Sequence, residues 1–170
     1  MSPAKTDERD SRRRLLDAAR DLIWRASYAG VSVDDLCKAA EVNKGTFYHF
    51  FKSKAELATV SFEDFWENVK RPLYDRLFSP QTPALKRLEQ YVQMMVDFQT
   101  TTRKDCGQVL GCPYTAVGSE VATQDESLRQ LASEMFDRNV RYLESAVRDA
   151  QHDGTLAEGD AKVLAQDLHA

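Results

Sequence analysis

One amphipathic pattern in the first third of the chain limits its possible folds more than any other feature. Phe47, Phe50 and Phe51 recur at spacings of three and four residues, which places three phenyl rings on one helical face. The remaining positions of this segment, and those just beyond it, are polar and mostly cationic: Lys44, Thr46, Tyr48, His49, Lys52 and Lys54. The segment is therefore either an ordinary amphipathic helix with a solvated basic face or a helix that presses against a polyanion.

The residues upstream favour the second interpretation. Ser32 and Asp35 have the spacing of a capping box, which predicts a short helix beginning at residue 33. Asn43 is a good N-cap for the helix that follows, so a tight turn separates two short helices. A longer helix, expected over residues 11–27 with Ser11 or Asp10 as its N-cap, precedes them. This is the helix-turn-helix arrangement, whose second helix enters the major groove of DNA.

The first of these helices has a basic start and a glycine near its end. Arg12, Arg13 and Arg14 are expected in its first turn, either as a solvated face or as phosphate contacts. Gly30 is expected to end the helix as a C′ glycine.

The rest of the chain also has helical periodicity. Ser53 and Glu56 form a second capping-box pattern, which opens a long helix that Pro72 should kink. A further helix is expected over residues 83–102, where Leu85, Leu88 and Val92 recur at spacings of three and four residues. Others are expected over residues 128–154 and after Asp160, which should cap the last helix, with a short irregular helix in the glycine-rich residues 107–118. The sequence therefore predicts an all-α chain with a flexible arm (1–10), a helix-turn-helix head (11–53) and a helical body (54–170).

Charge and composition narrow the class of function. Residues 1–54 hold 11 Lys and Arg against 8 Asp and Glu (+3), and residues 55–170 hold 12 against 19 (−7), within a net charge of −4. This split suggests a head that binds a polyanion, joined to a body that does not. There is no nucleophile elbow, HExxH, P-loop or GxGxxG motif, and no spacing of His and Cys typical of a zinc site. We therefore expect a protein that is not an enzyme and that binds no cofactor and no metal. No apolar run is long enough for a membrane span and no signal peptide is recognised, so a cytoplasmic protein is expected.

Four blocks of sequence between Arg14 and Leu57 resemble the tetracycline-repressor (TetR) family of bacterial regulators. They are Leu15-Leu16-Asp17-Ala18-Ala19, Gly30-Val31-Ser32-Val33-Asp34-Asp35-Leu36, Ala39-Ala40-Glu41-Val42 and the segment from Lys44 to Leu57. The resemblance implies a ligand-responsive repressor with a three-helix head and an antiparallel helical body that binds a small-molecule effector and forms a homodimer. Its implied partner is a palindromic operator in double-stranded DNA.

The resemblance also implies which side chains meet DNA. Those expected at the operator are Ser32, Asn43, Lys44, Gly45, Thr46, Tyr48, His49, Lys52 and Lys54. Lys44 and Thr46 are the best candidates for contacts with base edges, which specify sequence, whereas Ser32, Tyr48, Lys52 and Lys54 would position the head on phosphates.

Beyond residue 58 the resemblance is to an architecture rather than to a motif. The aromatic and methionine side chains of the body exceed a minimal core stripe, so they either fill the core or line a cavity for an apolar or aromatic effector: Phe62, Phe65, Trp66, Tyr91, Met94, Met95, Phe98, Tyr114, Met135, Phe136 and Tyr142. Effector binding would shift the helix over residues 54–78 and move the head with it, provided that its affinity differs between the two states.

Two features depart from the family pattern. Glu41 occupies a turn position where family members often have Gly, which predicts some backbone strain. Family members usually end with two long helices that pair across the dimer. This chain stops within the first of them, which indicates a short body or a form truncated at its C-terminus.

Two other classes of function stay open. Cys106 and Cys112 flank the glycine-rich segment, and the cations Arg103 and Lys104 would favour a reactive thiolate, so one hypothesis is an electrophile or oxidant sensor. Alternatively, both cysteines are small buried residues of the core. Unchanged DNA affinity after treatment with peroxide or a quinone would refute the sensor hypothesis. The chain as a whole could instead be a helical adaptor that binds another protein.

Overall fold

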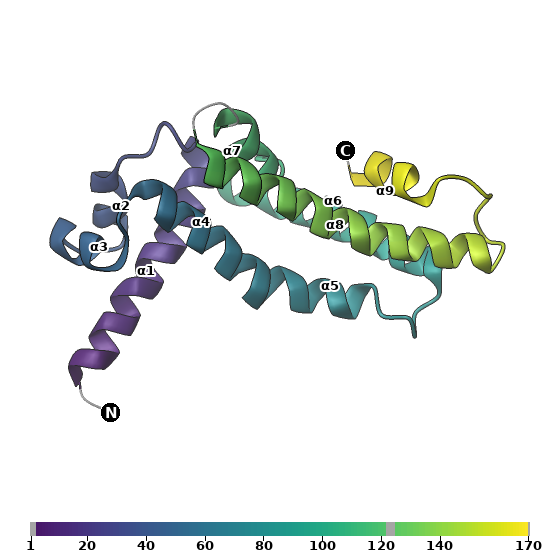
Figure 1. The fold of residues 1–170 in the computed structure, drawn as a ribbon, viewed down its shortest axis with the longest axis horizontal. Coiled ribbons are helices and arrows are strands. Elements are labelled where there is room, and N and C mark those ends of the chain that lie inside the picture. Colours follow the sequence, from purple (N-terminus) through teal and green to yellow (C-terminus); the bar gives the residue numbers. More distant parts are fainter. Residues whose placement is uncertain (1–2, 122–124, 170) are drawn as a thin grey trace. The chain divides into compact units, whose positions relative to one another are not determined.

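The computed structural model describes residues 3–121 and 125–169, and within these ranges the regular structure is entirely helical (Figure 1). This confirms the all-α prediction. The chain divides into two compact units, the first comprising residues 1–66 and 112–133 and the second residues 67–111 and 134–170. In the described residues, none of the helices has the length and hydropathy that a bilayer crossing requires.

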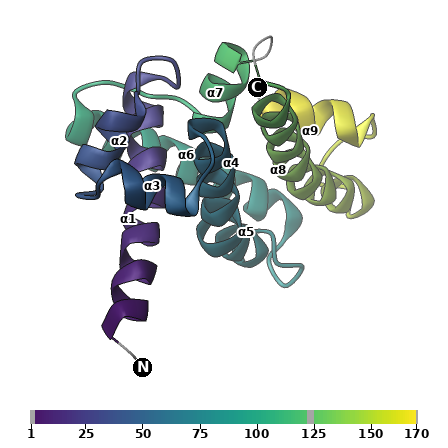
Figure 2. The same cartoon turned by 60° about the vertical axis from the view of Figure 1, so that its left-hand side comes forward.

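The first unit contains a three-helix head. Helices α1 (Pro3–Ala26), α2 (Val33–Ala39) and α3 (Lys44–Phe50) pack together, with α2 and α3 against α1 (Figure 2). The same unit includes α4 (Lys54–Phe65), α7 (Pro113–Val121) and the first turns of α8 (Glu126–His152). This unit therefore extends past the predicted head, and the functional division at residue 53 stays a prediction.

Helix α1 corrects three expectations. It begins at Pro3, so residues 3–10 of the arm predicted to be flexible are helical, whereas residues 1 and 2 lie outside the described residues. Ser11 lies inside the helix and is buried instead of capping it, and Asp10 pairs with Arg14 one turn later at 3.6 Å. The helix ends at Ala26, where Ser27 takes a left-handed conformation (φ 74°), so Gly30 is not its C′ residue. Gly30 is required for a different reason, because a Cβ there would lie 2.5 Å from the Ala26 carbonyl oxygen.

The predicted caps of the helix-turn-helix are present. The Ser32 hydroxyl accepts from the Asp35 N–H at 3.1 Å, and the Asp35 carboxylate accepts from the Ser32 N–H at 2.9 Å, which completes the capping box. The Asn43 side chain caps α3 by accepting from the Thr46 N–H at 2.8 Å. In the turn between the two helices Glu41 has φ 53°, a strained conformation for a residue with a Cβ, as the departure from Gly predicted.

The second capping pattern is only half confirmed. Ser53 caps α4 by accepting from the Glu56 N–H at 3.1 Å, but the Glu56 carboxylate accepts from the N–H of Lys52, at 2.6 Å, instead of that of Ser53. Helix α4 is followed by a π-helical turn, η1 (Trp66–Lys70), and by α5 (Arg71–Leu77). Pro72 explains this wide turn, because proline has no N–H and its ring clashes with the carbonyl four residues earlier.

Helix α7 is regular where an irregular helix was expected. Of the three glycines in that segment, Gly107 and Gly111 have positive φ and lie before the helix, whereas Gly118 lies inside it. A Cβ at Gly118 would approach the Cβ of Ala132 on α8 to 2.7 Å. The glycine therefore permits close packing of α7 on the first turns of α8.

The second unit is built on α6 (Ala84–Cys106), the later turns of α8, and α9 (Ala161–His169), which Asp160 caps as predicted. Buried Arg87 near the start of α6 pairs with Asp149 near the end of α8 at 2.8 Å, so these helices run antiparallel (Figure 1). At the other end, the rings of His169 on α9 and Phe136 on α8 lie 5.0 Å apart. Helices α8 and α9 are therefore antiparallel as well.

Candidate nucleic-acid interface and effector site

Helix α3 is anchored by its phenylalanines and exposes the opposite face. Phe47 is fully buried and Phe51 nearly so, whereas Phe50 is only half-buried. Phe51 has already left the helix, as the extended C-cap residue. The core of the head therefore holds Phe47 and Phe51, and the prediction that Phe50 is a core residue is only partly right.

The exposed face of α3 contains most of the predicted DNA contacts. Lys44, Gly45, Tyr48 and His49 are exposed, as is Lys52 just beyond the helix, whereas Thr46 is half-buried. The Tyr48 ring is 57% exposed, although its edge packs on Phe47 with the ring centroids 5.0 Å apart. An aromatic phenol, two ammonium groups and an imidazole are thus presented from a rigid base.

Two of the predicted contacts are already engaged in capping. The Ser32 hydroxyl donates to the Asp35 carboxylate at 2.6 Å, and this bond lowers the pKa of Asp35. The Asn43 amide oxygen accepts from the Thr46 N–H and, at 3.3 Å, from its hydroxyl. These side chains shape the two helix starts, and their contact with DNA stays a prediction.

Lys44 has an acidic neighbour on α2. Its ammonium lies 2.8 Å from the Asp34 carboxylate, and that hydrogen bond raises the pKa of Lys44. Both side chains are well exposed, and exposed ion pairs contribute little to stability because water and salt screen them. Lys44 therefore stays fully charged beside the exposed face of α3. Little free energy is needed to break its ion pair with Asp34 when the ammonium turns toward a phosphate or a base.

The arginines of α1 have partners within the first unit. Arg13 bonds to Asp17 and to Asp64, each at 2.6 Å, and Arg14 lies 3.8 Å from Glu41. The Arg12 guanidinium lies 5.7 Å from the centre of the Phe51 ring. They lie well inside α1 instead of in its first turn, and their contacts favour a structural role over contact with phosphates.

The aromatic residues predicted to line one effector cavity are divided between the two units. Phe62, Phe65, Trp66 and Tyr114 belong to the first unit, where the rings of Phe62 and Tyr114 pack 5.5 Å apart. Tyr91, Met94, Met95, Phe98, Met135, Phe136 and Tyr142 belong to the second.

Much of the second set is core. Tyr91, Tyr142 and two residues absent from the prediction, Tyr74 and Phe78, form one aromatic cluster with centroid distances of 5.3–6.2 Å. Burial and a hydrogen bond to Asp75 raise the pKa of Tyr142 to about 12. Phe98 and Phe136, by contrast, are exposed. The filled-core interpretation therefore fits Tyr91 and Tyr142.

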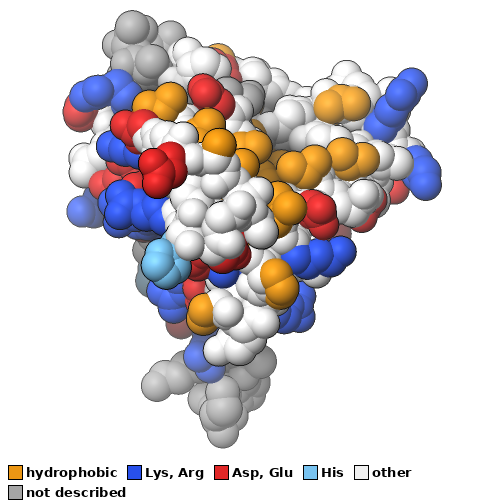
Figure 3. All heavy atoms as spheres, turned by 90° about the vertical axis from the view of Figure 1, so that its right-hand side faces the viewer, with side chains coloured by type: hydrophobic (Ala, Val, Ile, Leu, Met, Phe, Trp, Pro, Cys, Tyr) orange, Lys and Arg blue, Asp and Glu red, His pale blue; other side chains and the backbone are white. Residues whose placement is uncertain are grey.

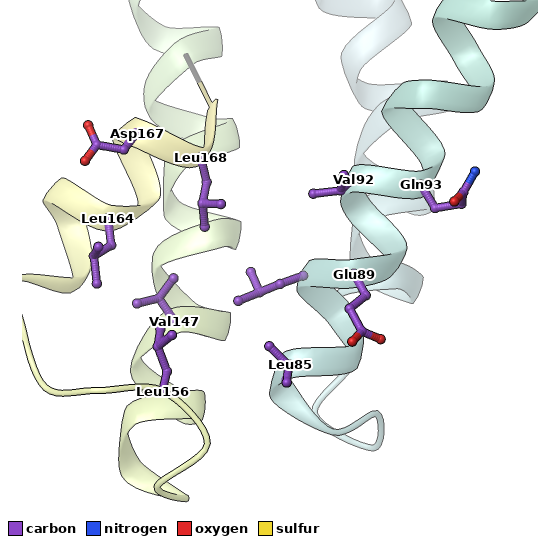
Figure 4. Close-up of a pocket in the computed structure, with 10 residues that line it drawn as sticks. Leu85, Glu89, Val92, Gln93, Val147, Leu156, Leu164, Asp167 and Leu168 are labelled. Atoms are coloured by element: carbon purple, nitrogen blue, oxygen red, sulfur yellow. The ribbon is translucent and has the colours of Figure 1, made fainter.

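An apolar groove in the second unit is lined by none of the predicted residues. It has a volume of about 630 Å³ and lies between α6 on one side and α8, α9 and their connection on the other (Figure 4). Its lining is Leu85, Leu88, Glu89, Val92, Gln93, Val147, Leu156, Leu164, Asp167 and Leu168. Figure 4 shows Val92 directed into the gap, whereas Asp167 and Gln93 point away from it. The spacing of Leu85, Leu88 and Val92 revealed a helical face but not that part of it borders an open groove.

A buried amide on α8 was also missed from the sequence. Asn139 is 1% exposed, its side-chain nitrogen donates to the Met135 carbonyl at 2.6 Å, and its side-chain oxygen has no hydrogen-bond partner in the part of the chain that the structure describes. A buried acceptor left unpaired costs about 1–3 kcal/mol. A water molecule or a donor on a ligand would satisfy it.

Two family models match this chain and together cover most of it. Residues 15–59 match bacterial regulatory proteins of the tetR family, and residues 84–170 match the tetracyclin repressor-like C-terminal domain. The chain belongs to the TetR family. Regulators of this family bind operator DNA and respond to small-molecule effectors, typically as dimers.

Similar proteins and structures agree with this assignment. The transcriptional repressor NemR of Escherichia coli K12 is 27% identical over 169 residues, which are 98% of this chain and 82% of NemR. The structure of the reduced form of E. coli NemR has a TM-score of 0.81 at 25% identity, covering 94% of this chain and 81% of the other. A regulatory protein TetR from Rhodobacter sphaeroides has a TM-score of 0.79 at 27% identity, covering 91% and 80%.

One predicted contact of the TetR-like head has to be withdrawn. Lys54 points inward, where its ammonium donates to the carbonyl oxygens of Tyr28 and Val31, each at 2.8 Å, and lies 4.1 Å from the centre of the Tyr28 ring. Burial lowers its pKa. Its position in sequence beside Lys52 suggested a phosphate contact, but packing gives it a structural task within the head.

The two candidate sensor thiols lie in different units. Cys106 is the last residue of α6 in the second unit, and Cys112 immediately precedes α7 in the first. Both are half-buried. The sensor hypothesis stays a prediction.

Proposed function

We propose that this TetR-family chain is a repressor that binds a palindromic operator as a homodimer and releases it when an uncharged apolar molecule binds to its second unit. The observation that supports operator binding is the exposed face of α3, where Lys44, Tyr48 and His49 project from a helix fixed by buried Phe47. A rigid polar helix of this kind suits the major groove. The proposal includes a cytoplasmic location and no catalytic activity.

Selection of bound fragments from a random DNA duplex library tests operator binding. Two heads related by twofold symmetry should enrich a palindrome with half-sites about one helical turn apart. With about four phosphates contacted by each head, the slope of log K against log salt should be on the order of −7. Absence of any enriched sequence, with binding to a protein partner instead, would support the adaptor alternative.

The groove of Figure 4 supports an apolar effector without negative charge. Seven of its ten lining residues are aliphatic, two are the carboxylates Glu89 and Asp167, and none is cationic. Burying an anion there would leave its charge without a partner, which is costly. Hydrophobic side chains also gather on the face drawn in Figure 3, and exposed valines and leucines of the second unit include Leu85, Val92, Val96, Val163 and Leu168. We therefore expect an uncharged aliphatic or alicyclic molecule.

A fluorescent probe and a groove-filling variant test this site. N-phenyl-1-naphthylamine, which is neutral, should bind the wild-type chain more tightly than anionic 1-anilinonaphthalene-8-sulfonate. Val92→Trp should weaken probe binding about tenfold or more by filling the groove, because the side chain already points into it.

Val163→Trp is the matched control, since Val163 is as exposed as Val92, each at 49%, and lies outside the groove. Equal probe binding by both variants would exclude the groove as the effector site. A change of oligomeric state confined to Val92→Trp would identify it as a subunit interface instead.

A further inference from the structure

The turn between α1 and α2 is held from two sides by opposite charges. On one side the Glu120 carboxylate of α7 accepts from the backbone N–H groups of Tyr28 and Ala29, at 2.8 and 2.5 Å. On the other side the Lys54 ammonium at the start of α4 donates to the carbonyl oxygens of Tyr28 and Val31. The backbone of residues 28–31 therefore uses both its donors and its acceptors on charged groups from two other helices.

This turn needs such external support because its own local hydrogen bonds are few and long. Ser27 has a left-handed conformation. In the described residues, the local hydrogen bonds of the turn that we identify are both long: the Val31 N–H donates to the Tyr28 carbonyl at 3.5 Å, and the Gly30 N–H donates to the Ser27 hydroxyl at 3.2 Å. Hydrogen bonds to ionised groups are about twice as strong as those between neutral groups. Glu120 and Lys54 therefore fix a backbone segment that local interactions leave weakly determined.

This turn also sets the position of α2 and α3, the two helices of the helix-turn-helix. It leads directly into Ser32, the N-cap of α2, and α2 packs on α3. A displaced turn would shift the start of α2 and, through it, the exposed face of α3. Glu120 need not touch DNA, where phosphates would repel its negative charge.

We propose that Glu120 is a positioning residue for operator binding, acting through the α1–α2 turn as the second half of a clamp whose first half is Lys54. Helix α7 is then a second route into the head, beside α4, and displacement of either helix releases one side of the turn. This inference rests on operator binding by the head, and its test separates the two.

Glu120→Gln is the informative variant. It keeps an acceptor of the same shape but removes the charge and leaves one of the two N–H groups poorly paired. Hydrogen exchange at the Tyr28 and Ala29 amides should become faster by about tenfold or more. Operator affinity should fall by a similar factor, with an unchanged slope of log K against log salt, because no phosphate contact is lost.

The sign of the change in operator affinity distinguishes the loss of support for the turn from the simple loss of a negative charge. Removing a negative charge from a DNA-binding unit should by itself raise the affinity for a polyanion. Glu63→Gln provides this reference, since Glu63 is an exposed residue of α4 in the same unit and makes no contact with the turn that we identify. A lower affinity in Glu120→Gln together with an equal or higher one in Glu63→Gln supports the clamp.

Two outcomes would overturn the proposal. One is wild-type operator affinity in Glu120→Gln, and the other is amide exchange at Tyr28 and Ala29 that does not change. If Glu120→Gln is poorly folded, Lys54→Gln tests the other side of the same turn, and its amide exchange should change in the same direction. Failure of the wild-type chain to bind any operator would instead refute the proposed function, and the exchange measurement would still report on the clamp.

Discussion

Phe47→Ala should lower the free energy of unfolding of the first unit by about 3–5 kcal/mol, the usual cost of removing a buried phenyl ring. The ring is fully buried, and its centre lies 6.3 Å from that of Phe51 and 5.0 Å from that of Tyr48. The cavity would lie beneath the only exposed helix face that we assign to the operator. Urea denaturation followed by circular dichroism measures the change, and a loss below about 1 kcal/mol would contradict this core position.

The neighbouring Tyr48 is the matched control for this prediction. Because its ring is 57% exposed, Tyr48→Ala should change the free energy of unfolding by no more than about 0.5 kcal/mol. Operator affinity should nevertheless fall about tenfold for each head, the cost of one hydrogen bond to a charged phosphate. Adjacent residues would thus separate stability from recognition, and full operator binding by Tyr48→Ala would contradict our assignment of this face.

Lys44→Ala should weaken operator binding and reduce its salt dependence together. Each head loses one cation, which would displace condensed counterions from the operator whether it meets a base edge or a phosphate. The slope of log K against log salt should therefore become less steep by about 1 for each head and about 2 for a dimer. At low salt the affinity of the dimer should fall roughly a hundredfold, since each head loses a contact worth about a factor of ten. Fluorescence anisotropy with labelled operator at several salt concentrations measures both effects.

The control for Lys44→Ala removes the same charge from the other unit. Lys162 is an exposed residue of α9 in the second unit, and Lys162→Ala should leave the salt slope unchanged. An equal change of slope in both variants would mean that net charge, and not a contact by α3, governs the binding.

The features that were predicted well depend on residues close together in the chain. The capping box of Ser32 and Asp35, the cap at Asn43 and the cap at Asp160 each join atoms two or three residues apart, so the spacing alone determines them. Pro72 likewise disturbs its helix through its own ring and missing N–H. The prediction of a flexible arm failed for residues 3–10 although it was local, because a polar composition does not exclude a helix with pairs such as Asp10 and Arg14.

The predicted effector residues show what periodicity leaves undecided. A repeating apolar stripe states that one face of a helix is buried, but not whether it meets other side chains or an open space. Tyr91 and Tyr142 meet Tyr74 and Phe78 in a core, whereas Leu85 and Val92 border a groove. Only packing between helices distinguishes these cases, because it depends on which side chains arrive from elsewhere.

The sequence alone determined the helical class, most helix boundaries, and a polar α3 face seated on buried phenylalanines, because these follow from periodicity and from caps that act within one turn. The tertiary structure decided the contacts of Lys54 and Glu120. Glu120 bonds to backbone groups 91 and 92 residues away, and Lys54 to carbonyls 23 and 26 residues away. No local spacing encodes such contacts, since they exist only once α1, α4 and α7 have packed together. A lysine that looked like a phosphate contact thus became part of the support for the helices that read DNA.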